Sequence, residues 1–320
     1  MPTRLTTTQR RLLDWADARG RDLPWRATRD PWAILVSEVM LQQTQVIRVI
    51  PVWTAFLERF PTASACADAP LADVVTAWAG MGYNRRAVNL HRCAQAIRDD
   101  HGGVVPCELD ALLTLAGVGR YTARAVLVFA FEQRVGVVDV NAARVHARLT
   151  GRALSIDEVQ RRADSATPID QPWRWNQAVL DLGATVCTKR SPKCGDCPLD
   201  RECGWHRVGC IDPDPVIGSA AIPRRQSTFE GSDRQGRGRL VDALRLAPVP
   251  NQALPRVMGW PNDPDRAERV AMSVVADGLA EWAPEEELFF LPESRVTSVT
   301  PKAKPEQSGN LPETREGGRR

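Results

Sequence analysis

The sequence predicts an all-α catalytic region followed by a small α+β domain. Apolar residues recur at helical spacing through the first two thirds of the chain, and no stretch before residue 210 alternates apolar and polar residues as a strand would. A proline-containing polar segment, 208–223, then precedes residues 224–292, whose pattern predicts helices and a hairpin. A chain of 320 residues is long enough for two such domains.

Composition limits the possible partners. The net charge is only +3, so any surface that attracts nucleic acid must be a local one. No apolar run reaches the ~20 residues of a membrane span, and the polar start does not read as a secretory signal. We therefore expect a cytoplasmic protein with no membrane partner, and we also expect a monomer. Four of the eight cysteines, Cys66, Cys93, Cys107 and Cys210, are scattered and expected to be inert.

The first helices follow from spacing and capping. Residues 5–19 form a plausible amphipathic helix, and Asp30-Pro31 reads as an N-cap followed by proline at the first helical position. The helix from Trp32 to Thr44 is apolar nearly all round, which predicts burial. Glu38 lies in its middle. A buried carboxylate is rare unless paired or functional, so a structural salt bridge and a functional acid both remain open.

Short helices are expected at 46–60, 71–79, 85–100 and 108–115, with prolines at their boundaries. The glycine turn before the third of these carries Tyr83, Arg85 and Arg86. An aromatic ring with basic side chains on a loop suits stacking on a base and contact with phosphate. The alternative is that Tyr83 closes the core.

The stretch from Leu115 to Asn141 is the most informative. Gly117 and Gly119 allow a sharp turn and a close approach to a ligand, and the helix that follows leaves its first amides unpaired, which favours an anion there. Asp139 then follows the apolar strip 135–138. The turn could hold a phosphate while the acid faces the attached sugar.

A helix over 142–149 carries Arg144 and Arg148 one turn apart, a pattern more typical of a solvated face than of a binding site. Another helix is expected at 173–186. Four thiols then fall within 17 residues and predict a metal centre: Cys187, Cys194, Cys197 and Cys203. Zinc competes with a [4Fe–4S] cluster, but zinc usually takes paired short spacings and only one short pair exists here.

The remaining elements form the second domain. Helices are expected at 234–246, near 251–258 and at 264–280, and Trp282 with 288–291 reads as a hairpin. That order favours a winged helix. From Glu293 the composition predicts disorder.

Taken together, Glu38, the glycine hairpin, Asp139 and the four cysteines resemble the helix-hairpin-helix iron–sulfur DNA glycosylases. The strings over 37–46 (SEVMLQQTQV), 81–83 (MGY) and 176–178 (NQA) are similar to those of the MutY-type adenine DNA glycosylases. The resemblance covers about residues 5–207. It implies a catalytic domain over 1–207 with a cluster loop at 187–203, a linker at 208–223, a small domain at 224–292 and a tail at 293–320.

The resemblance also implies an activity: a monofunctional glycosylase that removes adenine mispaired with 8-oxoguanine or guanine from double-stranded DNA. Related glycosylase/lyases carry a lysine where this chain has Tyr121. An amine there could form a Schiff base with the sugar, and tyrosine cannot. Two departures stand out. The family's Asp-Gly-Asn-Val reads Asp139-Val140-Asn141-Ala142 here, and no Nudix-like domain is recognisable in 224–292.

The resemblance also implies a role for each residue that matches a family position. Glu38 would protonate adenine and Asp139 would stabilise the sugar cation, with Tyr121 and Asn141 supporting the pair. The hairpin amides of Gly117 and Gly119 would grip phosphate above a monovalent cation. Substrate contacts are expected from Trp25, Arg26, Gln43, Tyr83 and Gln177. Two alternatives stay open, a glycosylase for another lesion or mismatch and a non-catalytic iron–sulfur DNA-binding regulator.

Overall fold

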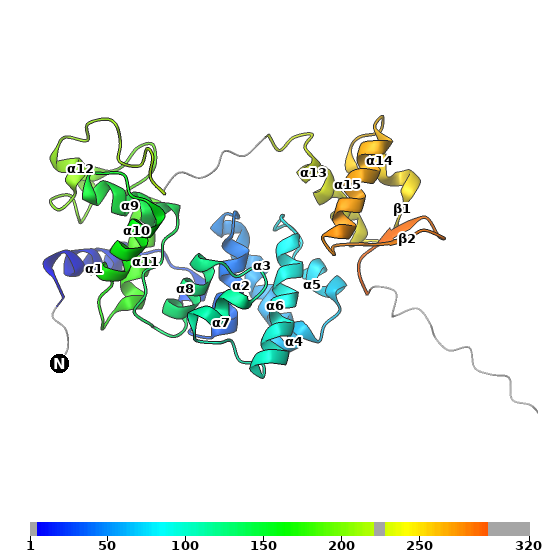
Figure 1. The fold of residues 1–320 in the computed structure, drawn as a ribbon, viewed down its shortest axis with the longest axis horizontal. Coiled ribbons are helices and arrows are strands. Elements are labelled where there is room, and N and C mark those ends of the chain that lie inside the picture. The colour runs from blue at the N-terminus through cyan, green and yellow to red at the C-terminus, as the bar shows by residue number, and fades with distance from the viewer. Residues whose placement is uncertain (1–4, 221–227, 294–320) are drawn as a thin grey trace, which may run out of the picture.

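The computed structural model describes residues 5–220 and 228–293, and it is helical up to residue 220 (Figure 1). The helices of this part are α1 (Thr7–Arg19), α2 (Pro31–Leu41), α3 (Val46–Arg59), α4 (Ala63–Ala67), α5 (Leu71–Ala77), α6 (Arg85–His101), α7 (Leu109–Thr114), α8 (Arg120–Phe129), α9 (Val140–Thr150), α10 (Ile156–Ala166), α11 (Pro172–Thr185) and α12 (Gly204–Arg207). The predicted tail lies outside the described residues except for Glu293.

Helix α2 begins and is buried as its sequence predicts. The Asp30 carboxylate accepts hydrogen bonds from the backbone amides of Trp32 (3.3 Å) and Ala33 (3.1 Å), and Pro31 occupies the first turn, where no amide is needed. Every residue from 32 to 40 is buried. A helix buried on all sides places any polar side chain it carries inside the protein, and Glu38 is that side chain.

The helices before residue 220 pack around two main apolar cores. One extends through α2–α8, and the other joins α1, α9 and α11 through residues such as Leu12, Val145 and Leu182. The segment 135–139 links α8 to α9 and so crosses from the first core to the second. Residues from the two cores can therefore face one another at this junction, and Figure 1 shows α8 between the two groups of helices.

The hairpin between α7 and α8 depends on Gly117. Its φ of +79° lies in the left-handed region that favours glycine, and a Cβ there would approach the Asn89 Cβ to 3.0 Å. Gly119 has an ordinary φ of −95° and caps α8. A Cβ at Gly119 would meet nothing within 4 Å, so this side of the turn is open.

The C-terminal part contains α13 (Asp233–Leu244), β1 (Val249–Pro250), α14 (Leu254–Met258), α15 (Pro264–Ala276), β2 (Glu281–Ala283) and β3 (Leu288–Phe290). The strands form one antiparallel sheet in the order β1-β3-β2, in which Trp282 pairs with Phe289. Helix α15 ends at Ala276, four residues before the predicted end, because Gly278 adopts a φ of +73° there.

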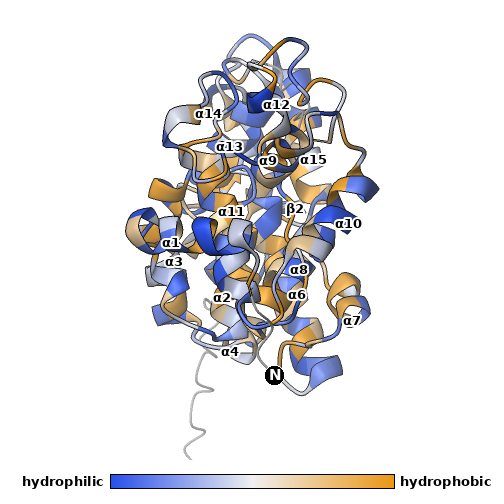
Figure 2. Ribbon diagram, turned by 90° about the vertical axis from the view of Figure 1, so that its left-hand side faces the viewer, coloured by the Kyte–Doolittle hydropathy of each residue, from blue (hydrophilic) through white to orange (hydrophobic). Residues whose placement is uncertain are grey.

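The core of this part is continuous with that of α2–α8. Helices throughout carry both hydrophobic and hydrophilic residues along their length (Figure 2), as amphipathic helices do. None of the described helices is both long and apolar enough to cross a membrane.

Candidate active site

Glu38 is a buried acid without a counter-ion. It is 4 % exposed, it takes part in none of the ion pairs between described residues, and its Oε2 has no hydrogen-bond partner among them. Burial, assisted by the negative charge of Asp139, raises its pKa from the usual 4.5 to about 7, against a hydrogen bond with Tyr121 that lowers it. The salt-bridge interpretation of Glu38 is therefore wrong, and the carboxyl group is poised to exchange a proton near neutral pH.

Tyr121 and Asp139 approach Glu38 from the two neighbouring elements. Tyr121 belongs to α8, and burial together with the two carboxyl groups raises the pKa of its phenol well above the usual value. Asp139 is the N-cap of α9, where its Oδ1 accepts from the Ala142 amide at 2.7 Å. The amide and the positive end of the helix dipole both favour negative charge on Asp139. The structure thus brings the two predicted acids close enough to interact.

A chain of hydrogen bonds holds Asp139 from the other side. The Asn141 amide donates to Asp139 Oδ2 at 2.8 Å, and Asn141 Oδ1 accepts from Arg144 at 2.8 Å. The Arg144 guanidinium also donates to the backbone carbonyls of Cys187 and Gly183, both at 2.7 Å. The prediction of a solvated face for Arg144 is wrong because these partners bury it to 6 % exposure.

Helix α11 fixes the backbone around Asp139. Asn176 accepts from the Val137 amide at 2.7 Å and donates to the Val135 carbonyl at 2.9 Å, which anchors the strip before Asp139. Gly183 lets α11 approach α9 closely, since a Cβ at Gly183 would lie 2.8 Å from the Asn141 Cβ. The sequence signal for this contact was a glycine inside an otherwise continuous helix.

A pocket of about 330 Å³ opens between α1 and α11, and neither Glu38 nor Asp139 lines it. Gln177 and Arg26, two of the predicted substrate contacts, both line it. Asp181, which sequence reasoning missed, pairs with Arg26 at 2.7 Å and with Arg21 at 2.6 Å and is almost fully buried. Arg21, which also lines the pocket, lowers the pKa of the Tyr121 phenol against the larger effects of burial and of the two carboxyl groups, which raise it.

The other predicted substrate contacts fall in different places. Trp25 is buried, packs edge-on against Trp53 with ring centroids 5.9 Å apart, and does not line this pocket. Gln43 and Tyr83 instead border a second, larger cleft. Tyr83 is 41 % exposed, so the alternative that it closes the core is wrong. The amides of Gly117 and Gly119 donate to no other described residue and remain available to a ligand.

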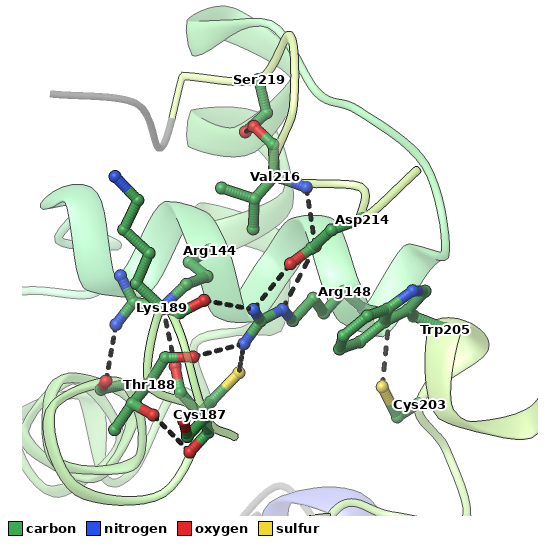
Figure 3. Close-up of polar contacts among 12 residues, drawn as sticks. Arg144, Arg148, Cys187, Thr188, Lys189, Cys203, Trp205, Asp214, Val216 and Ser219 are labelled. Carbon is green, nitrogen blue, oxygen red and sulfur yellow. Dashed lines mark hydrogen bonds and ion pairs between the residues drawn. The ribbon is translucent and has the colours of Figure 1, made fainter. Parts of the chain in front are cut away.

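Arg148 contacts the cysteine loop from α9, as Arg144 does. Arg148 is 2 % exposed and its guanidinium donates to Cys187 Sγ (3.5 Å) and to the carbonyls of Thr188 (2.7 Å) and Lys189 (3.2 Å), as Figure 3 shows. It also pairs with Asp214 at 2.7 Å and stacks 4.7 Å from the Trp205 ring centroid. The predicted solvated face is wrong here too. Asp214 belongs to the segment predicted as a linker, so part of that segment packs on α9.

The four thiols lie near enough to one another for their charges to interact. Burial is the main reason that the pKa of Cys197 rises to about 12, and the charges of Cys187, Cys203 and Cys194 add to it. Within residues 5–220 and 228–293, no three cysteine, histidine or acidic side chains converge closely enough to hold a single metal ion. Zinc bound at about 2.3 Å would need its thiolates almost in contact.

Cys210 was predicted to be scattered, but it lies beside the cysteine loop. Its side chain lies against that of Cys194, and burial with this neighbour raises the pKa of Cys194 to about 11. The backbone amide of Cys210 donates to the Trp205 carbonyl at 3.0 Å, which folds the chain back onto the loop. No spacing rule includes this fifth cysteine.

Comparison with known proteins agrees with this geometry. Residues 36–168 match the family model described as HhH-GPD superfamily base excision DNA repair protein. The chain is 44 % identical to an adenine DNA glycosylase of Mycolicibacterium smegmatis over 84 % of this chain and 91 % of that protein. It is 35 % identical to the human adenine DNA glycosylase over 81 % of this chain and 48 % of that protein.

Solved structures show the same fold. A thermostable thymine-DNA glycosylase matches with a TM-score of 0.60 and 30 % identity, covering 62 % of this chain and 95 % of that one. A trapped endonuclease III–DNA covalent intermediate matches with a TM-score of 0.55 and 26 % identity, covering 65 % of this chain and all of that one. The buried acid, the capped aspartate and these similarities agree, and the chain belongs to the adenine DNA glycosylase family within the HhH-GPD superfamily.

Proposed function

We propose that this protein excises adenine paired with 8-oxoguanine or guanine in double-stranded DNA, as a step of base excision repair. Membership of the family supports the adenine specificity. The observation that carries the chemistry is the pairing of Glu38, an acid whose pKa is raised to about 7, with Asp139, an acid that caps a helix, across the junction of the two cores.

The reaction begins with extrusion of the target nucleotide, because a stacked adenine hides its glycosidic bond. We expect the base to enter the pocket lined by Gln177 and Arg26, while Gln43 and Tyr83 act on the duplex it has left. Glu38 then donates its proton to N7 of adenine. Protonation turns a poor leaving group into a better one, and the raised pKa keeps that proton available near pH 7.

Departure of adenine leaves positive charge on the deoxyribose. Asp139, fixed by the Ala142 amide and the Asn141 side chain, stabilises this cation or adds to it. Glu38, now ionised, can take a proton from the attacking water. The Tyr121 phenol, whose pKa is raised, stays protonated and orients Glu38. No amine is expected to reach the sugar, so we expect base release without strand cleavage.

The four cysteines would hold a [4Fe–4S] cluster, to which we assign a structural role. When bound, the cluster supplies metal–thiolate bonds that close the loop at 187–203. Arg148 and Arg144 connect that loop to α9, and through α9 to Asp139. A monovalent cation beneath the hairpin and a monomeric state stay predictions.

The domain division also belongs to this proposal: a glycosylase domain at 1–207, a linker at 208–223 and a winged helix at 224–292. The order α13-β1-α14-α15-β2-β3 and the sheet order β1-β3-β2 support the winged helix.

The test is a panel of duplexes incubated with the wild-type enzyme and with Asp139→Asn. Free adenine and alkali-labile abasic sites should appear with adenine opposite 8-oxoguanine or guanine, and Asp139→Asn should reduce their formation by orders of magnitude while still binding DNA. Release of another base from the panel would assign a different lesion. Binding without any base release would indicate a non-catalytic regulator.

A further inference from the structure

Arg86, in the first turn of α6, is a buried cation to which the mechanism above gives no role. Its side chain is 8 % exposed, and it takes part in none of the ion pairs between described residues. Burial lowers its pKa from 12.5 to about 10, so the guanidinium is still charged near neutral pH. The contact with phosphate expected for this loop does not extend to Arg86, because its two Nη groups bind protein acceptors.

The two Nη groups of Arg86 bind two different segments. Nη1 donates to three carbonyls at and just after the end of α2, those of Val39 (2.9 Å), Met40 (2.8 Å) and Gln42 (2.6 Å). Nη2 donates to the Thr44 hydroxyl at 2.9 Å and to two carbonyls of the glycine turn, those of Met81 and Gly82, both at 3.1 Å. One side chain therefore joins the end of α2 to the turn before α6.

Two of these carbonyls belong to peptides that directly precede strained residues. The Gln42 carbonyl precedes Gln43, whose φ is +58°, and the Gly82 carbonyl precedes Tyr83, whose φ is +45°. Residues other than glycine rarely adopt such values, and they keep them only where the surrounding structure holds the backbone. Arg86 holds the backbone at both places, and its guanidinium also lies 5.8 Å from the centroid of the Tyr83 ring.

The same guanidinium fixes the turn of α2 that carries Glu38. Val39 and Met40 directly follow Glu38, and their carbonyls are among the last four of the helix, which have no partner within it. A cation at this end of a helix is also favoured by the helix dipole. Arg86 thus connects the acid to Gln43 and Tyr83, the two residues expected to act on the duplex.

We propose that Arg86 is a positioning residue for base extrusion, which holds Gln43 and Tyr83 in a fixed relation to Glu38 so that their insertion into the duplex delivers the adenine to the acid. This inference rests on the proposed function, in which an adenine leaves the stack. Lysine cannot replace Arg86 in this role, because a single ammonium group lacks the planar fork that reaches both segments at once.

Extrusion can be followed without base release. The duplex would carry 2′-fluoro-2′-deoxyadenosine as the target, because fluorine destabilises the sugar cation and so blocks cleavage. A 2-aminopurine placed next to the target becomes more fluorescent when its neighbour leaves the stack. Stopped-flow fluorescence at saturating enzyme concentration then gives the rate of extrusion in the bound complex.

Full-length wild type would be compared with Arg86→Lys, Thr44→Val and Arg92→Met. Arg86→Lys keeps the charge and removes the fork. Thr44→Val keeps the shape of the side chain and removes one acceptor of Nη2. Arg92→Met is the matched control, because Arg92 is an exposed arginine of the same helix and does not border the cleft that contains Gln43 and Tyr83.

Arg86→Lys should slow the fluorescence rise about 10-fold or more, Thr44→Val should slow it about 3-fold, and Arg92→Met should match wild type. Loss of folded enzyme lowers the amplitude of the signal but not its rate. A wild-type rate in Arg86→Lys, with only the amplitude reduced, would show a merely structural role and overturn the inference. If Arg86→Lys does not fold, the rate of Thr44→Val decides the question in the same way.

The two proposals can fail separately. If wild type releases adenine but Arg86→Lys extrudes the target at the wild-type rate, only the inference about Arg86 is wrong. If wild type extrudes the target faster than Arg86→Lys but releases no adenine from an unmodified duplex, the catalytic proposal is wrong and the role of Arg86 stands.

Discussion

Replacing Glu38 by glutamine should abolish base release and at the same time stabilise the protein above neutral pH. Glutamine keeps the size of the side chain but carries no acidic proton and no charge. The stabilisation is expected because a carboxyl group that is 4 % exposed and lacks a counter-ion is costly to ionise.

The magnitude follows from the raised pKa of Glu38. In the unfolded chain the group titrates near 4.5 and in the folded protein at about 7. Between these values the folded state holds a proton that the unfolded state has lost, so wild-type stability falls as the pH rises through this window. At about 1.4 kcal/mol per tenfold change in proton affinity, the loss above pH 7 is roughly 3 kcal/mol. Glu38→Gln removes this loss.

Urea unfolding of wild type and Glu38→Gln at pH 5 and pH 8 measures this difference. The variant should gain most over wild type at pH 8, and Glu58→Gln, an exposed position on α3, should change nothing at either pH. Single-turnover adenine release should fall about tenfold per pH unit above 7 in wild type and be absent in Glu38→Gln. A variant less stable than wild type at pH 8 would show that ionised Glu38 does not destabilise the fold, and one that retains turnover would show that Glu38 is not the acid.

Three further outcomes are expected. Gly183→Ala should slow single-turnover base release about 100-fold, because the added Cβ would displace Asn141. Gly195→Ala is the control and should not slow release, because a Cβ at Gly195 would meet nothing within 4 Å. Equal rates for the two variants would contradict the close contact between α9 and α11. Arg148→Met should lower the iron content and the visible absorption per protein, because Arg148 is buried against the cysteine loop. Arg152→Met, which changes an exposed neighbour, should leave both unchanged. A full iron content in Arg148→Met would show that Arg148 is not needed to hold the loop. Borohydride added during wild-type turnover should trap no protein–DNA adduct, and a trapped adduct would show that an amine replaces the lysine absent at Tyr121.

The sequence predicts those parts of this fold that depend on local chemistry. Asp30-Pro31 starts a helix because capping involves only residues a few positions apart, and Gly117 marks a turn because its conformation excludes other residues. Glu38 could be singled out because a helix that is apolar all round leaves an acid no exposed side. The sequence strings over 37–46, 81–83 and 176–178, which lie in different helices and turns, then indicated the family.

Contacts between distant segments were beyond such reasoning. Arg144 and Arg148 form a stripe on one helix, and only the fold brings the cysteine loop, about 40 residues later, over that stripe. Asp181 pairs with Arg26 across 155 residues, and no local pattern marks either residue as the other's partner. Arg144, Arg148 and Asp181 are all buried by residues of other elements, so the sequence of their own helix could not predict their exposure.

The titration of Glu38 itself tests most directly whether this acid holds the proton that adenine receives. Infrared difference spectra of wild type minus Glu38→Gln, recorded from pH 5 to pH 9, isolate the carbonyl stretch of this one protonated carboxyl group. We expect this band to be present at pH 5, to have half its intensity at about pH 7 and to be lost at pH 9. A carboxylate that is already ionised at pH 5 would contradict the claim that Glu38 holds the proton that adenine receives.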